Sequence, residues 1–88
     1  MTEAQVRTAL TDMLREILND PGLELPADRR ESDIAKFDSG NKVMLILAIE
    51  ERFAIRLRSR EIDALRTFGD WVTLVHSHST SAGGRQQD

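Results

Sequence analysis

A serine at a polar corner is the residue of this sequence with the clearest chemical potential. Ser39 ends the stretch 36–39 and precedes the strongly apolar stretch 43–49. The pattern predicts a helix over 40–53 with Ser39 as its N-cap, because a serine hydroxyl accepts hydrogen bonds from the free amides of a first helical turn. Two interpretations follow: Ser39 only caps the helix, or its hydroxyl is exposed so that another enzyme can modify it.

Composition excludes several classes of function. The 88 residues carry a net charge of −3, which disfavours generic nucleic-acid binding. No apolar run approaches the roughly 20 residues of a membrane span, and the N-terminus lacks the pattern of a signal peptide, so we expect a cytoplasmic protein. The chain has no cysteine, so any thiol that it uses must come from a cofactor.

Apolar periodicity predicts an all-α protein. Helices are expected over 2–18, 40–53 and 59–65, the last of these capped by Ser59, and a final helix begins at Thr67 with Asp70 completing a capping box. The loop between the first two helices is long, and we expect apolar side chains to anchor it: Leu23, Leu25, Ile34 and Phe37. The stretch 54–58 is expected to be an extended connector with Ile55 or Leu57 in the core. The expected organisation is one folded domain over 1–76 and a disordered tail over 77–88.

The second helix is apolar over an unusually wide arc. Its expected inner stripe is Val43, Ile46, Ile49 and Phe53, while Leu47 borders this stripe and Met44 lies outside it. Such an arc indicates either loose core packing or a surface presented to another molecule, and both interpretations remain open.

The sequence offers no convincing catalytic machinery. A serine hydrolase needs a fixed base beside its serine, but His76 and His78 lie in or next to the expected tail. The neighbouring carboxylates Glu50 and Glu51 fit a solvated helix face. We therefore predict a protein that is not an enzyme and has no metal site.

Arginines gather after the second helix. This basic patch is either part of an ordinary mixed surface or a docking site for an acidic partner. It consists of Arg52, Arg56, Arg58 and Arg60.

The corner and the helix after it resemble the acyl carrier protein family. Asp38-Ser39 resembles the family's Asp-Ser-Leu attachment motif, and the similarity continues without a gap to about Val75. The positions that carry the similarity are Val43, Leu45, Ala48, Ile49, Glu50, Glu51, Phe53, Ile55, Leu57, Glu61, Ile62, Leu65, Thr67 and Val72.

The resemblance implies a four-helix bundle of acyl carrier protein type, with a long loop between helices 1 and 2 and a short third helix. It implies that a phosphopantetheinyl transferase, with Mg²⁺, attaches 4′-phosphopantetheine from coenzyme A to Ser39, with Asp38 and Gly40 completing the motif. The arm would carry acyl or aminoacyl groups as thioesters. The implied partners of a monomeric carrier are that transferase and the loading and acyl-transfer enzymes. They would meet the apolar arc of the second helix, with Met44 and Leu47, and the acidic positions Asp38, Glu50 and Glu51. Arg56 and Arg58 of the basic patch are further candidates for partner binding.

Three departures from the family pattern favour a specialised fatty-acyl, lipid or secondary-metabolite pathway. Gly40 replaces the usual leucine, the approach 33–38 is one residue longer, and the family's acidic face is diluted. The substitutions on that face are Lys42, Met44 and Arg52. The alternative is a helical adapter that keeps the carrier fold but is never modified, and Gly40 is the feature that favours it.

Overall fold

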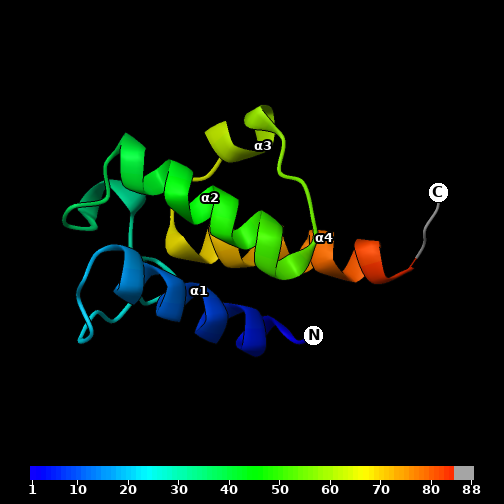
Figure 1. Ribbon diagram of the computed structural model, residues 1–88, viewed down its shortest axis with the longest axis horizontal. Coiled ribbons are helices and arrows are strands. Elements are labelled where there is room, and N and C mark those ends of the chain that lie inside the picture. The colour runs from blue at the N-terminus through cyan, green and yellow to red at the C-terminus, as the bar shows by residue number, and fades with distance from the viewer. Residues whose placement is uncertain (85–88) are drawn as a thin grey trace.

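The predicted all-α bundle is confirmed by the computed structural model, which describes residues 1–84. Its helices are α1 (Glu3–Ile17), α2 (Ser39–Phe53), the short α3 (Ser59–Asp63) and α4 (Phe68–Gly84), with a single 3-10 turn, η1 (Glu31–Asp33), in the long loop. In Figure 1, α2 lies between α1 and α3, and α4 runs behind them. No helix in this part of the chain has the length and apolar character needed to cross a bilayer.

One apolar core joins the helices. α1 packs against both α2 and α4, and its side chains Leu10 and Leu14 are almost completely buried. Burial of a large aliphatic side chain contributes roughly 1.5–3 kcal/mol to the free energy of unfolding, so these contacts dominate the stability of so small a domain. The other core residues are Val6, Leu18, Leu25, Ile34, Leu45, Ile49, Ile55, Leu57, Leu65, Phe68, Trp71, Val72 and Val75.

The inner face of α2 differs from the predicted stripe. Leu45 and Ile49 are its buried residues, whereas Val43 is 53% exposed. The prediction for Val43 was wrong because every residue from 43 to 49 is apolar, so periodicity alone leaves the rotation of the helix undetermined. Ile46 and Phe53 pack at the edge of the core.

Capping hydrogen bonds fix the helix starts. Thr2 accepts from the Gln5 N–H at 3.1 Å, and its own N–H donates to the Gln5 side chain at 2.8 Å. The predicted capping box at Thr67 is confirmed, since Asp70 N–H donates to the Thr67 hydroxyl at 3.2 Å and the Asp70 carboxylate accepts from the Thr67 N–H at 3.1 Å. These reciprocal bonds satisfy amides that a helix start leaves free.

The cap of α3 lies one residue earlier than predicted. Ser59 is the first helical residue and Arg58 is the N-cap. The Arg58 N–H donates to the Glu61 carboxylate at 3.0 Å. The Glu61 carboxylate therefore binds the N–H of the N-cap residue, and no serine hydroxyl caps the first turn of α3.

The connector between α2 and α3 is extended, and both of its apolar side chains, Ile55 and Leu57, are buried as predicted. α2 ends at Phe53, and its C-cap, Ala54, adopts a left-handed conformation (φ 55°, ψ 46°). This conformation is unfavourable for a residue with a Cβ atom, so the sharp turn out of α2 stores strain at this alanine.

The long loop is tied down along its length. Leu25 and Ile34 are buried, and Leu23 and Phe37 pack against the core, as predicted. The loop also forms one isolated antiparallel bridge, between Arg30 and Thr67. The loop therefore lies against the start of α4.

The last helix continues beyond the predicted boundary at residue 76. α4 extends to Gly84, so residues 77–84 are helical where their polar composition had predicted a disordered tail. The remainder of the predicted tail, 85–88, lies outside the described residues. Composition does not reveal the contact that joins the beginning of this extension to α3: the His78 ring lies 3.0 Å from a carboxylate oxygen of Glu61.

Candidate functional site

Ser39 is the first residue of α2, and its side chain is exposed. The N-cap is not Ser39, as predicted, but Asp38, whose carboxylate accepts from the Asn41 N–H at 2.9 Å. Aspartate and serine are about equally good caps, so the sequence alone does not decide between two adjacent ones. Since Asp38 takes the capping role, the Ser39 hydroxyl is left available at the mouth of the helix.

The corner that leads into Ser39 is held by its own hydrogen bonds. Lys36 has a positive φ of 68°, and its carbonyl oxygen accepts from the Asp38 N–H at 3.0 Å and from the Asn41 side-chain amide at 2.8 Å. A side chain of the first turn of α2 thus closes the corner that precedes it. These hydrogen bonds hold the backbone that leads into Ser39 in one conformation.

The space around Gly40 is open. A Cβ atom added at Gly40 would meet only the Asp38 carboxylate, at 3.6 Å, which is an ordinary contact distance. The residues at the mouth of α2 therefore fit a group attached to Ser39, because no neighbouring side chain walls off the hydroxyl. The glycine is not required by packing within this chain.

A polar network under the corner was missed by sequence reasoning. Glu31 of η1 accepts from Lys42 Nζ at 2.9 Å and from the Trp71 indole N–H at 3.0 Å. Lys42 Nζ also lies 6.0 Å from the centre of the Trp71 ring, and Phe37 meets the same ring edge-on. The loop, α2 and α4 are joined at this point. The only sign of this network in the sequence was Lys42, which follows the serine by three residues.

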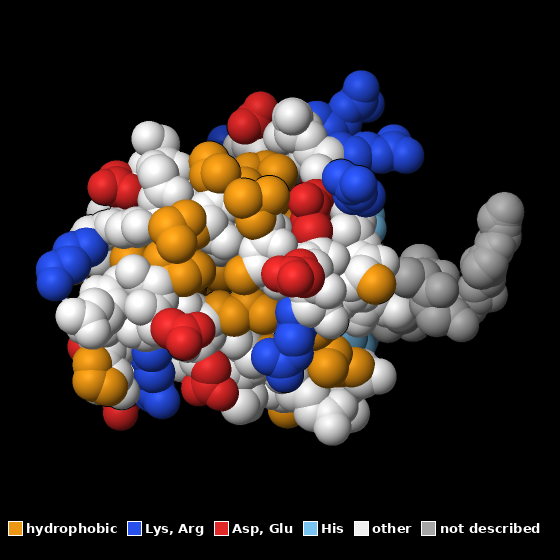
Figure 2. Space-filling view, in the orientation of Figure 1, with side chains coloured by type: hydrophobic (Ala, Val, Ile, Leu, Met, Phe, Trp, Pro, Cys, Tyr) orange, Lys and Arg blue, Asp and Glu red, His pale blue; other side chains and the backbone are white. Residues whose placement is uncertain are grey.

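Exposed apolar side chains lie along the outer face of α2. Met44 is 54% exposed and Leu47 is 60% exposed, next to the exposed Val43. Figure 2 shows apolar side chains gathered over this part of the molecule. Of the two interpretations of the wide apolar arc, a surface presented to another molecule fits these exposures.

The two predicted acidic docking residues have different surroundings. Glu51 is exposed, but Glu50 is partly buried and accepts from the Leu57 N–H at 2.8 Å. Glu50 therefore holds the connector between α2 and α3 whatever else it does. An open hollow of about 390 Å³ lies beside it, lined by Leu47, Glu50, Ala54, Ile55 and Arg56.

The arginines of the connector project into solvent. Arg56, Arg58 and Arg60 are all exposed, and Figure 2 shows basic side chains grouped at the corner near α3. Arg56 lines the same hollow as Leu47, so an apolar and a cationic side chain lie next to each other on one surface.

The histidines do not complete a catalytic site with Ser39. The His78 ring contacts Glu61 across α3 and α4. The pKa of the Glu61 carboxyl lies below its ordinary value, mainly because it accepts a hydrogen bond from the Arg58 N–H and, to a smaller extent, because it is bound to His78. No cluster of three or more potential metal ligands exists within the described residues.

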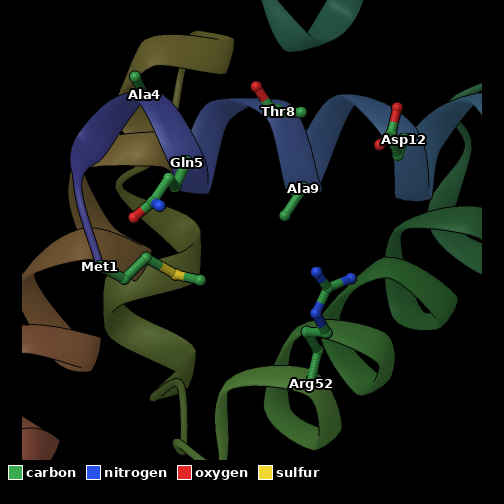
Figure 3. Close-up of a pocket in the computed structure, with 7 residues that line it drawn as sticks. All are labelled: Met1, Ala4, Gln5, Thr8, Ala9, Asp12 and Arg52. Carbon is green, nitrogen blue, oxygen red and sulfur yellow. The ribbon is translucent and has the colours of Figure 1, made fainter.

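A second hollow lies far from Ser39. It measures about 420 Å³ and is formed between α1 and the last turn of α2. Figure 3 shows the Arg52 guanidinium pointing into this space from α2, with Ala9 facing it from α1. Arg52 follows Ser39 by thirteen residues, roughly 20 Å along the helix axis. This hollow is therefore separate from the serine corner.

Comparisons with known proteins give consistent results. No family model matches the sequence. The chain is 26% identical over 82 residues to the acyl carrier protein of Acidothermus cellulolyticus, covering 93% of this chain and 98% of that protein. It is also 26% identical over 74 residues to the acyl carrier protein of Kineococcus radiotolerans, covering 84% and 91%.

A solved structure has the same fold. The solution structure of holo acyl carrier protein from Geobacter metallireducens superposes with a TM-score of 0.84, covers 94% of this chain and 95% of its own, and is 24% identical in sequence. At that identity the likeness concerns the fold.

Proposed function

We propose that this chain is a member of the acyl carrier protein family and that it carries acyl groups as thioesters on a 4′-phosphopantetheine arm attached to Ser39. The protein is a carrier and not an enzyme. The observation that supports this proposal most directly is the exposure of Ser39 at the start of α2, with the capping role taken by Asp38.

The arm would supply the thiol that the chain itself lacks, since the sequence contains no cysteine. The chain contributes an accessible hydroxyl on a fixed corner, and the Asp38 cap leaves that hydroxyl free. No base is needed from the chain, because a phosphopantetheinyl transferase brings its own Mg²⁺ and proton acceptors. The absence of a second thiol in the protein also leaves nothing in the chain to compete for the thioester.

We propose further that the surface formed by Met44, Leu47, Glu51, Arg56 and Arg58 meets the loading and acyl-transfer enzymes. Glu50 takes part mainly by holding the connector through Leu57. Apolar side chains supply buried contact area, and arginines are favoured at protein interfaces. The basic group selects an acidic surface on the partner. This differs from the acidic face that the family resemblance implies and supports a specialised pathway, with aminoacyl or hydroxyacyl cargo as well as fatty-acyl cargo within its range.

The second candidate is an adapter that keeps the carrier fold and is never modified. Gly40 is the specific observation in its favour, because a leucine at this position would fill a pocket on the transferase. A cytoplasmic location remains the prediction for either candidate.

Measuring the intact mass of the protein separates the two candidates. The purified protein is incubated with coenzyme A, Mg²⁺ and a broad-range transferase, and in parallel with an extract of the organism that encodes it. The carrier gains the mass of one phosphopantetheine, and Ser39→Ala abolishes the gain. A lack of gain in the native extract contradicts the carrier and supports the adapter.

A further inference from the structure

Lys42 lies one helical turn after Ser39. Residues three apart on an α-helix are neighbours, with Cβ atoms about 5–6 Å apart, and helical side chains lean toward the N-terminal end. The Lys42 side chain therefore leaves the helix on the same side as Ser39 and toward it. In the unmodified protein its ammonium group is bound to Glu31, at 2.9 Å.

A phosphodiester on Ser39 changes the charges at this corner. The group is an anion, and it is attached directly beside the Asp38 carboxylate that caps the helix. Two neighbouring anions repel each other, and the attraction of a nearby cation to both offsets that repulsion. Lys42 follows the serine by one helical turn, whereas Lys36 precedes the helix and has a positive φ of 68°.

We propose that Lys42 binds the phosphate of the attached arm, and that it leaves Glu31 to do so. The inference rests on the proposed function, because it requires the arm on Ser39. It assigns to Lys42 a binding role toward the arm. It also makes the Lys42–Glu31 ion pair the contact through which attachment is sensed.

The existing ion pair is suited to exchange. The Lys42 and Glu31 side chains retain 26% and 22% of their exposure, so the charges are still hydrated and their attraction is modest. Both residues line an open polar hollow of about 320 Å³, which gives the lysine space to move.

We expect Lys42, and not the other charged residues around the hollow, to move toward the phosphate. They are Arg30, Asp63 and Arg66. The Arg66 guanidinium is held locally, since it donates to the carbonyl oxygens of Asp63 at 2.7 Å and Leu65 at 3.1 Å. Arg30 is exposed and lies in the loop beside Glu31, so it is available to the carboxylate that Lys42 leaves.

Trp71 can report whether Lys42 leaves Glu31. Glu31 also accepts from the indole N–H of Trp71, which is the only tryptophan in the sequence. When the ammonium group leaves, the charge next to that hydrogen bond and next to the indole ring changes. The indole N–H resonance of Trp71 therefore shifts when Ser39 is modified.

The experiment compares unmodified and modified protein by ¹H–¹⁵N correlation spectra and by ³¹P spectra, with intact mass recorded for each sample. Wild type is expected to show a shift of the Trp71 indole cross-peak on modification. The Lys42→Gln variant should show a displaced indole cross-peak before modification and no further change after it. Its ³¹P signal should differ from that of the modified wild type.

Two control variants make the test specific. Lys36→Gln removes the other nearby cation but leaves Glu31 and Trp71 untouched, so it should behave as wild type. Lys42→Arg keeps a cation and should preserve both the indole shift and the ³¹P signal. This control also covers the case in which Lys42→Gln fails to fold.

The outcomes separate this inference from the proposed function. No gain of mass overturns the proposed function, and the inference with it. A gain of mass with an unchanged Trp71 indole cross-peak overturns the inference alone. So does a Lys42→Gln protein whose ³¹P signal and indole shift equal those of wild type.

Discussion

The backbone N–H of Gly69 donates to the carbonyl oxygen of Ala27 over 2.8 Å, so the first turn of α4 lies directly against the long loop. A Cβ atom at Gly69 would lie 2.8 Å from that same oxygen and 3.2 Å from the Ala27 Cβ. Both separations are shorter than van der Waals contact. The loop that leads to Ser39 can approach α4 this closely only because residue 69 has no side chain.

Gly69→Ala is therefore expected to lower the free energy of unfolding by about 1–3 kcal/mol, since the added methyl group must push two backbone segments apart. Urea unfolding followed by the fluorescence of Trp71 measures the change. Gly22→Ala is the matched control, because a Cβ there would meet only an Asp20 oxygen at 4.0 Å. Equal stability of the two variants would contradict the close approach.

Gly40→Leu is expected to increase the rate at which a broad-range transferase modifies Ser39. The leucine restores the side chain of the family motif, and the space at Gly40 is open enough to accept it. Replacing a helical glycine should also raise the free energy of unfolding by up to about 1 kcal/mol. The rate is followed by intact mass against time.

Gly40→Ala separates the two effects of that change. It should give most of the gain in stability without the side chain that fills the transferase pocket. If Gly40→Ala accelerates modification as much as Gly40→Leu, helix stability and not pocket filling limits the reaction.

Ala54→Gly is expected to stabilise the protein by about 1 kcal/mol, because Ala54 has a left-handed backbone (φ 55°) that glycine adopts without strain. The same substitution at Ala48, within α2, should instead destabilise by about 1 kcal/mol. Thermal unfolding of the two variants gives the signs. Destabilisation at both positions would show that the turn after α2 is not strained.

The Glu61 carboxylate is expected to give stability that depends on pH. In the folded state the Arg58 N–H and His78 lower the pKa of the Glu61 carboxyl below its ordinary value of 4.5. The stabilisation from the ionised carboxylate is therefore present above pH 4.5 and is lost as the pH falls through the lower pKa of the folded state. Glu61→Gln should therefore be most destabilising at neutral pH, and its difference from wild type should shrink below pH 4.5.

Urea unfolding at a series of pH values tests this sign. His78→Gln removes only one of the two groups that favour the ionised carboxylate. It should weaken the pH dependence without abolishing it, because the Arg58 N–H has the larger effect. A Glu61→Gln difference that grows as the pH falls would contradict the assignment.

Leu47→Ser and the double change Arg56→Glu with Arg58→Glu are expected to leave stability almost unchanged, since all three side chains are exposed. With the arm attached to Ser39, each variant should show a higher KM than wild type for acyl transfer to or from a partner enzyme. The charge reversal should also change the salt dependence, because screening weakens attraction between exposed charges. The matched control is Arg7→Glu, on the exposed side of α1.

The sequence predicted the elements more reliably than their first residues. Asp38 and Ser39 are both good caps, and the sequence does not say which one adopts the extended backbone of an N-cap. At α3 the cap is Arg58, whose side chain has no acceptor, and Glu61 satisfies its N–H. Side chains from the first turn of the helix decide such boundaries.

The parts of the site that the sequence did not reveal are long-range contacts. Trp71 follows Glu31 by 40 residues, and His78 follows Glu61 by 17. Neither pair has a spacing typical of a motif, so only the packed bundle brings them together. By contrast, Ser39 and its corner are contiguous in the sequence and were predictable as one unit.

The exposure of Met44 has a chemical consequence for the whole surface of α2. Oxidation to the sulfoxide turns a flexible apolar side chain into a polar one, and the chain has no cysteine to react in its place. Mild peroxide should therefore act on the accessible thioethers Met1 and Met44 and alter docking at α2 while the bundle stays folded. Storage under reducing conditions would preserve that surface.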